Sequence, residues 1–194
     1  MFNDPAARAV QERFVTFAAR DPKLLRDVLR HSSDAEHRAL AAQVIAYTPN
    51  KQAIVNDLVE ATRDPAEGVR NNATRSLAVM AGSAQQTTKQ QIRIPIRPFI
   101  EMLNSIEWTD RNKSSLALLR LTEKRAPAVL SELRQKALLS LNEMARWKSS
   151  GHACASFFLL GRVAGLPEGE ITAAWERGDR ASFIETATKS AKAK

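Results

Sequence analysis

The feature that most constrains this chain is a helical pattern that recurs along the sequence. Residues 32–42, "SSDAEHRALAA", and residues 64–74, "DPAEGVRNNAT", align so that Arg38 matches Arg70, 32 positions later. Each segment begins in a polar turn and continues into a helix of small and aliphatic residues. A repeat of this length, with a second helix between the two copies, predicts stacked helix pairs rather than one bundle.

The pattern continues beyond these two copies. A shift of 41 residues places Arg111 at the Arg70 position, and a further 41 residues places His152 there. Apolar residues with helical spacing, broken by Pro, Gly and Asp, predict about eleven short helices and no convincing strand. We therefore predict an all-α fold, a right-handed α-solenoid of about four to five helix pairs.

The segment "DPAEGVRNNATRSL", residues 64–77, and more loosely Asp34–Arg38 resemble the HEAT-like repeats, in particular the short bacterial form first seen in phycobilisome lyases. The pattern is Asp-Pro, then Val-Arg, then Ala at helical spacing. The resemblance covers residues 32–82 clearly and residues 98–165 more weakly. It implies a surface of stacked helix pairs; lyase activity belongs to some relatives only, and nothing in this chain indicates it.

The domain organisation follows from the repeats. We expect one HEAT-like domain over residues 1–185. It is divided into an N-terminal cap pair (1–31), the clearest repeats (32–82), a long loop (83–97), further repeats (98–165) and a C-terminal cap (166–185). Residues 186–194, rich in Lys and Ala, are predicted to be a disordered basic tail.

The long loop is a candidate for function, because long irregular segments in compact arrays often bind ligands or partners. Its basic residues Lys89, Arg93 and Arg97 are the candidates. Ile92, Ile94 and Ile96 alternate as in a strand, but Pro95 and Pro98 argue against a paired interior strand.

The stretch "EWTDRNKSS", residues 107–115, concentrates aromatic, charged and hydroxyl side chains. Its repeat position predicts the start of a helix, where Thr109 or Asp110 accepts hydrogen bonds from the first amides. Trp108 is expected to pack on Ser114 or Leu118 of its own helix. Because the same residue types suit binding, the partner-binding candidates are Arg38, Arg70, Trp108, Asp110, Arg111, Lys113, Trp147 and Lys148.

Two functions are compatible with this pattern. The first, which we expect, is a non-catalytic scaffold that binds a protein or peptide; the net charge of +8 favours an acidic partner. The alternative is nucleic-acid binding on a basic concave face, as in the HEAT-like DNA glycosylases, where Trp, Asp and Arg line the site. The basic excess is spread along the chain, without the dense Lys/Arg run of a nucleic-acid-binding arm.

Other chemistry finds little support in the sequence. The single cysteine, Cys154, excludes an internal disulfide and lies in an apolar run, so we expect a small core residue. No metal-ligand, nucleotide-binding or hydrolase motif occurs, so we expect neither cofactor nor metal and no enzymatic activity. The first residues lack a basic start and an apolar run, and no stretch is long enough to span a bilayer. We expect a cytoplasmic monomer that does not enter membranes.

Overall fold

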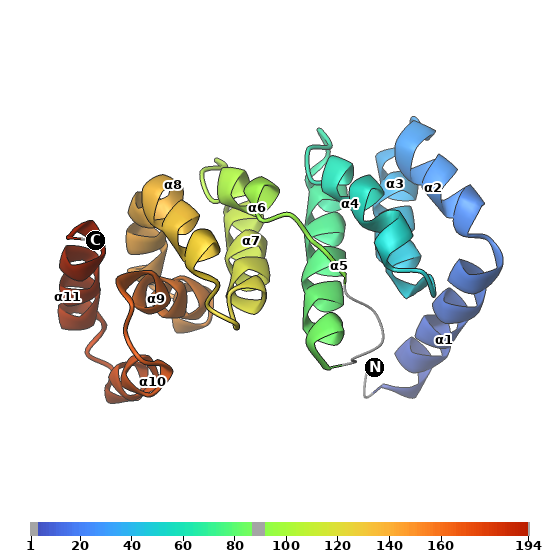
Figure 1. The fold of residues 1–194 in the computed structure, drawn as a ribbon. Coiled ribbons are helices and arrows are strands. Elements are labelled where there is room, and N and C mark those ends of the chain that lie inside the picture. Colours follow the sequence, from blue (N-terminus) through green and yellow to red (C-terminus); the bar gives the residue numbers. More distant parts are fainter. Residues whose placement is uncertain (1–3, 87–91, 194) are drawn as a thin grey trace. The chain divides into compact units, whose positions relative to one another are not determined.

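The chain folds into short α-helices joined by turns (Figure 1). The structure, a computed structural model, describes residues 4–86 and 92–193. These contain eleven α-helices, two short 3-10 helices and no strand. The elements are α1 (Pro5–Arg20), α2 (Pro22–His31), α3 (Ala35–Val44), η1 (Ile45–Tyr47), η2 (Gln52–Ile54), α4 (Val55–Ala61), α5 (Glu67–Gln86), α6 (Arg97–Met102), α7 (Trp108–Leu121), α8 (Pro127–Ala145), α9 (Ser150–Ala164), α10 (Glu168–Arg177) and α11 (Arg180–Lys192).

The helices form two compact units, Met1–Pro95 and Ile96–Lys194. In the first unit α2 packs on α4 and α3 packs on α5, so the pairs α2–α3 and α4–α5 stack in register. In the second unit α6 packs on α8 and α7 on α9, and α11 extends the layer on α9. This stacking of successive pairs is the all-α, HEAT-like architecture that the repeats predicted.

Local sequence explains where the helices begin and end. The Asp34 carboxylate accepts hydrogen bonds from the amides of Glu36 and His37 at 2.7 and 3.2 Å, so it caps α3. At the other end of the chain α9 stops at Gly165, whose φ of 81° is the left-handed conformation that glycine adopts readily. Both boundaries were predicted from the sequence.

Small residues let the helices of the first unit approach closely. Ala41 and Ala42 on α3 and Ala73 on α5 are buried. At this contact the side chains of Asn72 and Ser76 donate hydrogen bonds to the carbonyls of Ala39 and Ala42, at 2.9 and 2.8 Å. The polar groups of α5 thus bond directly to the α3 backbone, which fixes the register of the two helices.

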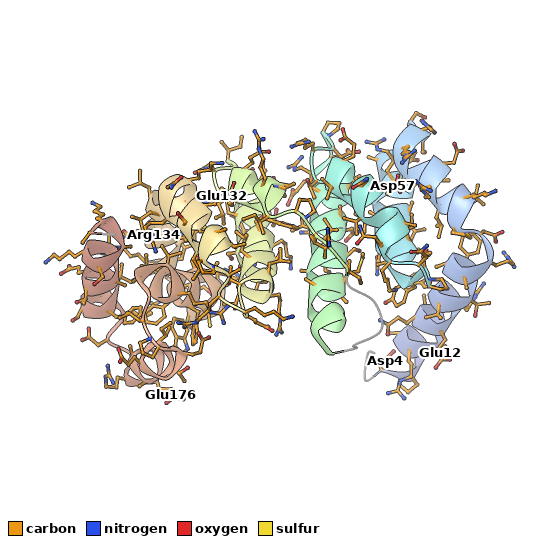
Figure 2. The ribbon with its side chains drawn as sticks, viewed as in Figure 1. Asp4, Glu12, Asp57, Glu132, Arg134 and Glu176 are labelled. Carbon is orange, nitrogen blue, oxygen red and sulfur yellow. The ribbon has the colours of Figure 1, made fainter. Side chains whose placement is uncertain are left out.

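A buried carboxylate joins the outer helices of the same unit. Asp57, labelled on α4 in Figure 2, has a fully buried side chain. Arg26 and Arg30, one turn apart on α2, both form ion pairs with it; the Arg26 Nε to Asp57 Oδ2 distance is 2.8 Å. Both guanidinium groups are partly exposed, whereas the carboxylate is not. Because the two arginines of α2 pair with this one carboxylate, α2 is anchored to α4 at one point.

Two sequence predictions are wrong in this region and at the C-terminal end. The long loop was expected to begin at residue 83, but α5 continues to Gln86 and shortens the irregular segment. The tail expected to be disordered over 186–194 is helical through Lys192. Ala187 and Ala191 are buried, and α11 packs on α8 and α9, so a small-residue stripe that looked like low complexity is a packing face.

Three ionised side chains join α7, α9 and α10 in the second unit. Arg162 on α9 is 6% exposed and donates to the Leu119 carbonyl at 2.6 Å and to the Thr122 hydroxyl at 3.0 Å. Its guanidinium also pairs with both carboxylate oxygens of Glu168, at 2.6 and 3.1 Å. Arg125 reaches the same carboxylate at 2.6 Å. Two cations therefore converge on Glu168.

Because of this arrangement, the free energy of unfolding depends on pH in the acidic range. The hydrogen bond from Arg162, with that from Arg125, lowers the pKa of Glu168 to about 2. Its pKa in the unfolded chain is higher, so between about pH 4.5 and 2 the unfolded state binds more protons and stability falls as pH falls. We expect Glu168→Gln to flatten this part of the profile of unfolding free energy against pH, measured by urea denaturation. Glu170→Gln, an exposed neighbour, serves as control; equal flattening by both variants would contradict the assignment.

Candidate functional site

The repeat arginine Arg38 is used inside the fold. Its Nε and Nη2 donate to the two carboxylate oxygens of Asp64 at 2.7 and 2.9 Å, and both side chains are nearly buried. The hydrogen bond from Arg38 lowers the pKa of Asp64. Since Asp64 begins the turn before α5, this bidentate pair ties one repeat to the next.

Arg70 makes an equivalent local contact. Its Nη1 donates to the carbonyls of Asp64 and Pro65, six and five residues earlier, each at 2.9 Å. Arg38 does the same with the carbonyls of Ser32 and Ser33 at 2.9 and 3.2 Å. The aligned arginines thus share one structural task, closing the turn that precedes their helix.

Three of the candidates in the second unit take part in two side-chain contacts, Arg111 with Trp147 and Trp108 with His152. The Arg111 guanidinium pairs with the Glu143 carboxylate at 2.7 and 3.0 Å and lies over the Trp147 ring, 5.2 Å from its centroid. The centroid of the Trp108 ring lies 4.9 Å from that of His152 on α9, a contact that the sequence did not predict. The segments "EWTDRNKSS" and "MARWKSSGH" therefore meet, and we call Trp108, Arg111, Trp147 and His152 the aromatic cluster.

The remaining candidates of this region divide by burial. Asp110 is 2% exposed and accepts a hydrogen bond from the Ser105 hydroxyl at 2.9 Å. It lies in the first turn of α7, where a carboxylate complements the helix dipole, but Glu107 rather than Thr109 or Asp110 is the N-cap residue. Lys113 is half-buried and Lys148 is exposed.

The loop candidates have separate surroundings. Arg93 is exposed, and its backbone amide donates to the Gln52 side chain at 2.8 Å. Arg97, also exposed, pairs with Glu101 one turn later in α6 at 2.9 Å. Lys89 lies outside the described residues. Residues 92–96 form neither helix nor strand, which confirms the interpretation of the alternating isoleucines as a loop.

A groove of about 640 Å³ lies in the first unit, formed by α1, α2 and α3. Three large apolar side chains that line it are half exposed: Val10 at 48%, Leu24 at 52% and Leu40 at 51%. We call this the N-terminal groove. Its lining residues are Val10, Arg13, Phe14, Thr16, Phe17, Arg20, Leu24, Leu25, Val28, His37, Leu40, Ala41 and Val44.

The lining of the N-terminal groove contains two arginines and no carboxylate. The two arginines are Arg13 and Arg20; Glu12, labelled on α1 in Figure 2, is not part of the lining. Arg20 pairs with Asp21 and lies over the Phe17 ring at 5.3 Å, whereas Arg13 forms no ion pair with any residue that the structure describes. An apolar floor with a cationic edge suits an apolar ligand that carries acidic groups.

Sequence reasoning missed this groove for an identifiable reason. Helical spacing marks Val10, Phe14 and Phe17 as one apolar face, and such a face normally indicates the core. Only the packing shows that α1 leaves that face partly uncovered. One sequence feature could have indicated the groove: residues 1–31, expected to be a cap pair, contain more large apolar residues than a cap with a polar outer face needs.

Other reactive groups are weaker candidates for a functional site. Cys154 is partly buried on α9, and desolvation raises the pKa of its thiol, which lowers the thiolate fraction at neutral pH. In residues 4–86 and 92–193, no three His, Cys, Asp or Glu side chains are grouped closely enough to hold a metal ion. Within the same ranges no helix is long and apolar enough to cross a membrane.

Comparison with known proteins agrees with the fold. Residues 22–91 match the model of the HEAT repeat family, which spans α2 to α5, the two stacked pairs of the first unit. Over these residues the chain is similar to the HEAT repeats. A comparison with curated proteins found no match. HEAT repeats generally serve as protein-interaction scaffolds, so protein partners are the general expectation for this class.

Proposed function

We propose that this chain is a non-catalytic interaction module, and that it binds an acidic amphipathic helix of a protein partner in the N-terminal groove. The observation that carries the proposal is the half-exposed apolar lining of that groove beside Arg13, a cation with no ion-pair partner among the described residues. Soluble monomers rarely expose a contiguous apolar surface without a use for it.

The spacing of the lining residues suits a helix as occupant. Val10, Phe14 and Phe17 stand at i, i+4 and i+7 on α1, a ridge of roughly 10 Å at 1.5 Å per residue. Two turns of a partner helix cover the same length, and its own i, i+3 and i+7 side chains can lie between this ridge and Leu24 and Leu40. An extended strand would find no exposed sheet edge in the described residues.

Charge supports an acidic partner. Arg13 at the edge of the groove has no described ion-pair partner, so a glutamate on the polar side of a docked helix would gain a contact without breaking another. The net charge of +8 would mainly speed encounter with an acidic chain. The apolar contacts would then set how long the complex lasts.

A defined peptide tests the proposal. The probe is a fluorescein-labelled helical peptide with leucines at i, i+3 and i+7 and glutamates elsewhere, followed by anisotropy. We expect the Leu24→Glu/Leu40→Glu variant to weaken binding by about tenfold or more, because two buried apolar contacts are lost and two like charges introduced. Both leucines are half exposed, so the variant is expected to fold.

The control is Leu139→Glu, which adds one glutamate, where the groove variant adds two, at an 81% exposed leucine in the second unit. A second peptide, with every glutamate replaced by lysine, should bind at least about tenfold more weakly than the acidic one. The proposal fails if Leu139→Glu reduces affinity as much as the groove variant, or if the two peptides bind equally.

Nucleic-acid binding remains the second candidate, because Lys113 and Lys148 lie in the segments that meet at the aromatic cluster. Arg111 lies over the Trp147 ring and His152 lies against the Trp108 ring at a tilt of 39°, which leaves less ring surface for base stacking. Anisotropy of labelled DNA over a salt series tests it. Tight binding at physiological salt, with a steep salt slope reduced by Lys113→Ala/Lys148→Ala, would favour this candidate over the groove.

A further inference from the structure

A second depression in the first unit, of about 400 Å³, differs from the N-terminal groove in chemistry. It lies among α1, α3, η1, the turn after η1 and α5. We call it the lysine pocket. Its lining residues are Gln11, Gln43, Ala46, Tyr47, Lys51, Asn72, Arg75, Ser76, Val79 and Met80.

The lysine pocket contains two cations and no carboxylate. The Lys51 ammonium is half-buried and donates a hydrogen bond to the Ala46 carbonyl, a neutral acceptor. Burial without a counter-ion lowers the pKa of Lys51. Arg75 is exposed, and none of the described residues forms an ion pair with either cation. An anion placed here would compensate a desolvated charge that the fold leaves uncompensated.

A hydroxyl adds a third donor. Gln11 Nε2 donates to the Tyr47 hydroxyl oxygen at 2.7 Å, so the tyrosine proton is available to another acceptor. The polar groups on the α5 side are engaged elsewhere: the Asn72 amide and the Ser76 hydroxyl donate to carbonyls of α3. Lys51 and Arg75, which form no described ion pair, and the Tyr47 hydroxyl therefore supply hydrogen-bond donors to the pocket.

The other part of the lining is aliphatic. Ala46, Val79 and Met80 line the pocket with carbon and sulfur, and Val79 is 60% exposed. An inorganic anion would leave this surface uncovered. An organic anion would place its charged end on the donors and its carbon chain on the apolar wall, the usual division of a small-molecule site.

We propose that the lysine pocket binds a small organic carboxylate, held by Lys51, Arg75 and Tyr47 at its oxygens and by Val79 along its aliphatic chain. The Arg75 fork suits bidentate contact with a planar carboxylate, and the Lys51 ammonium adds a point charge. This site is separate from the N-terminal groove and does not depend on the proposed protein partner.

The proposal is tested by titrating the full chain with acetate, butyrate and hexanoate. Binding is followed by two-dimensional NMR at constant ionic strength. We expect affinity to increase from acetate to hexanoate, and hexanamide, which lacks the charge, not to bind. Lys51→Gln and Arg75→Gln should each weaken hexanoate binding by about tenfold, the loss of one charge-assisted contact. Arg75 is exposed, so its variant decides the question even if Lys51→Gln unfolds the protein.

Arg13→Gln is the matched control, since it removes a cation from the N-terminal groove of the same unit. Unchanged hexanoate affinity in this variant supports the lysine pocket as the site. The proposal is overturned if Arg13→Gln weakens binding as much as Arg75→Gln does. It is also overturned if inorganic phosphate binds more tightly than hexanoate, or if no carboxylate produces saturable shifts.

Discussion

Replacement of Arg162 by methionine is expected to lower the free energy of unfolding of the second unit by about 2–4 kcal/mol. The side chain is 6% exposed and its guanidinium bonds the Leu119 carbonyl, the Thr122 hydroxyl and both oxygens of Glu168. Methionine fills similar space but leaves the buried carbonyl without this donor. The Glu168 carboxylate, which is about half exposed, retains Arg125 and water, so the loss stays below that of a fully buried pair.

Urea denaturation followed by tryptophan fluorescence measures this effect, because all three tryptophans, Trp108, Trp147 and Trp175, belong to the second unit. Arg177→Met removes an exposed guanidinium from α10 and should change stability by less than about 0.5 kcal/mol. Arg162→Lys should fall between the two, since it keeps the charge and loses the fork. Equal stability of the Arg162→Met and Arg177→Met variants would show that the network contributes nothing.

The second large effect is expected at a glycine inside α9. A Cβ added at Gly161 would lie 2.6 Å from Ile171 Cγ1 and 3.1 Å from Phe183 Cζ, so the Ile171 side chain or α10 itself must shift to accept it. Overpacking of this kind costs about 1–3 kcal/mol, and alanine returns about 1 kcal/mol of helix propensity. We expect Gly161→Ala to destabilise the second unit by a net amount of about 2 kcal/mol, since the contact is at the severe end of the range.

The matched control is Gly169→Ala on α10, where no atom lies within 4 Å of the added Cβ. That variant should gain up to about 1 kcal/mol from helix propensity alone. The same fluorescence assay compares the two. If both alanine variants stabilise the protein, the close approach of α9 and α10 at Ile171 is not a packing constraint.

Both predictions concern how the second unit holds its terminal helices, and this bears on the tail that was expected to be disordered. Phe157, fully buried on α9, stacks on Phe183 of α11 with ring centroids 4.2 Å apart, and its ring edge meets Trp175 of α10 at 5.1 Å. These contacts anchor α10 and α11. The alanines of α11 then pack on helices already in place, which composition alone does not reveal.

For the candidate sites, the sequence was a better guide to residue type than to role. Arg38 and Arg111 were selected by repeat position, and the structure places each in a bidentate pair, with Asp64 and Glu143. A sequence cannot show that a basic side chain is already occupied, because the acid that occupies it comes from another helix. Lys51 and Arg13 attracted no attention, since a cation without a partner looks the same in sequence as one with a partner.

The sequence by itself determined the class of fold and many helix ends. The 32-residue recurrence of Arg38 at Arg70, the Asp34 cap and the Gly165 stop are local patterns, and local backbone and capping energies act on them directly. The tertiary structure alone decided the rest. It showed which apolar face of α1 stays uncovered, which cations lack an acid, and how closely α9 approaches Ile171. The physical reason is that burial and ion pairing depend on distances between segments far apart in the chain, which no local pattern encodes.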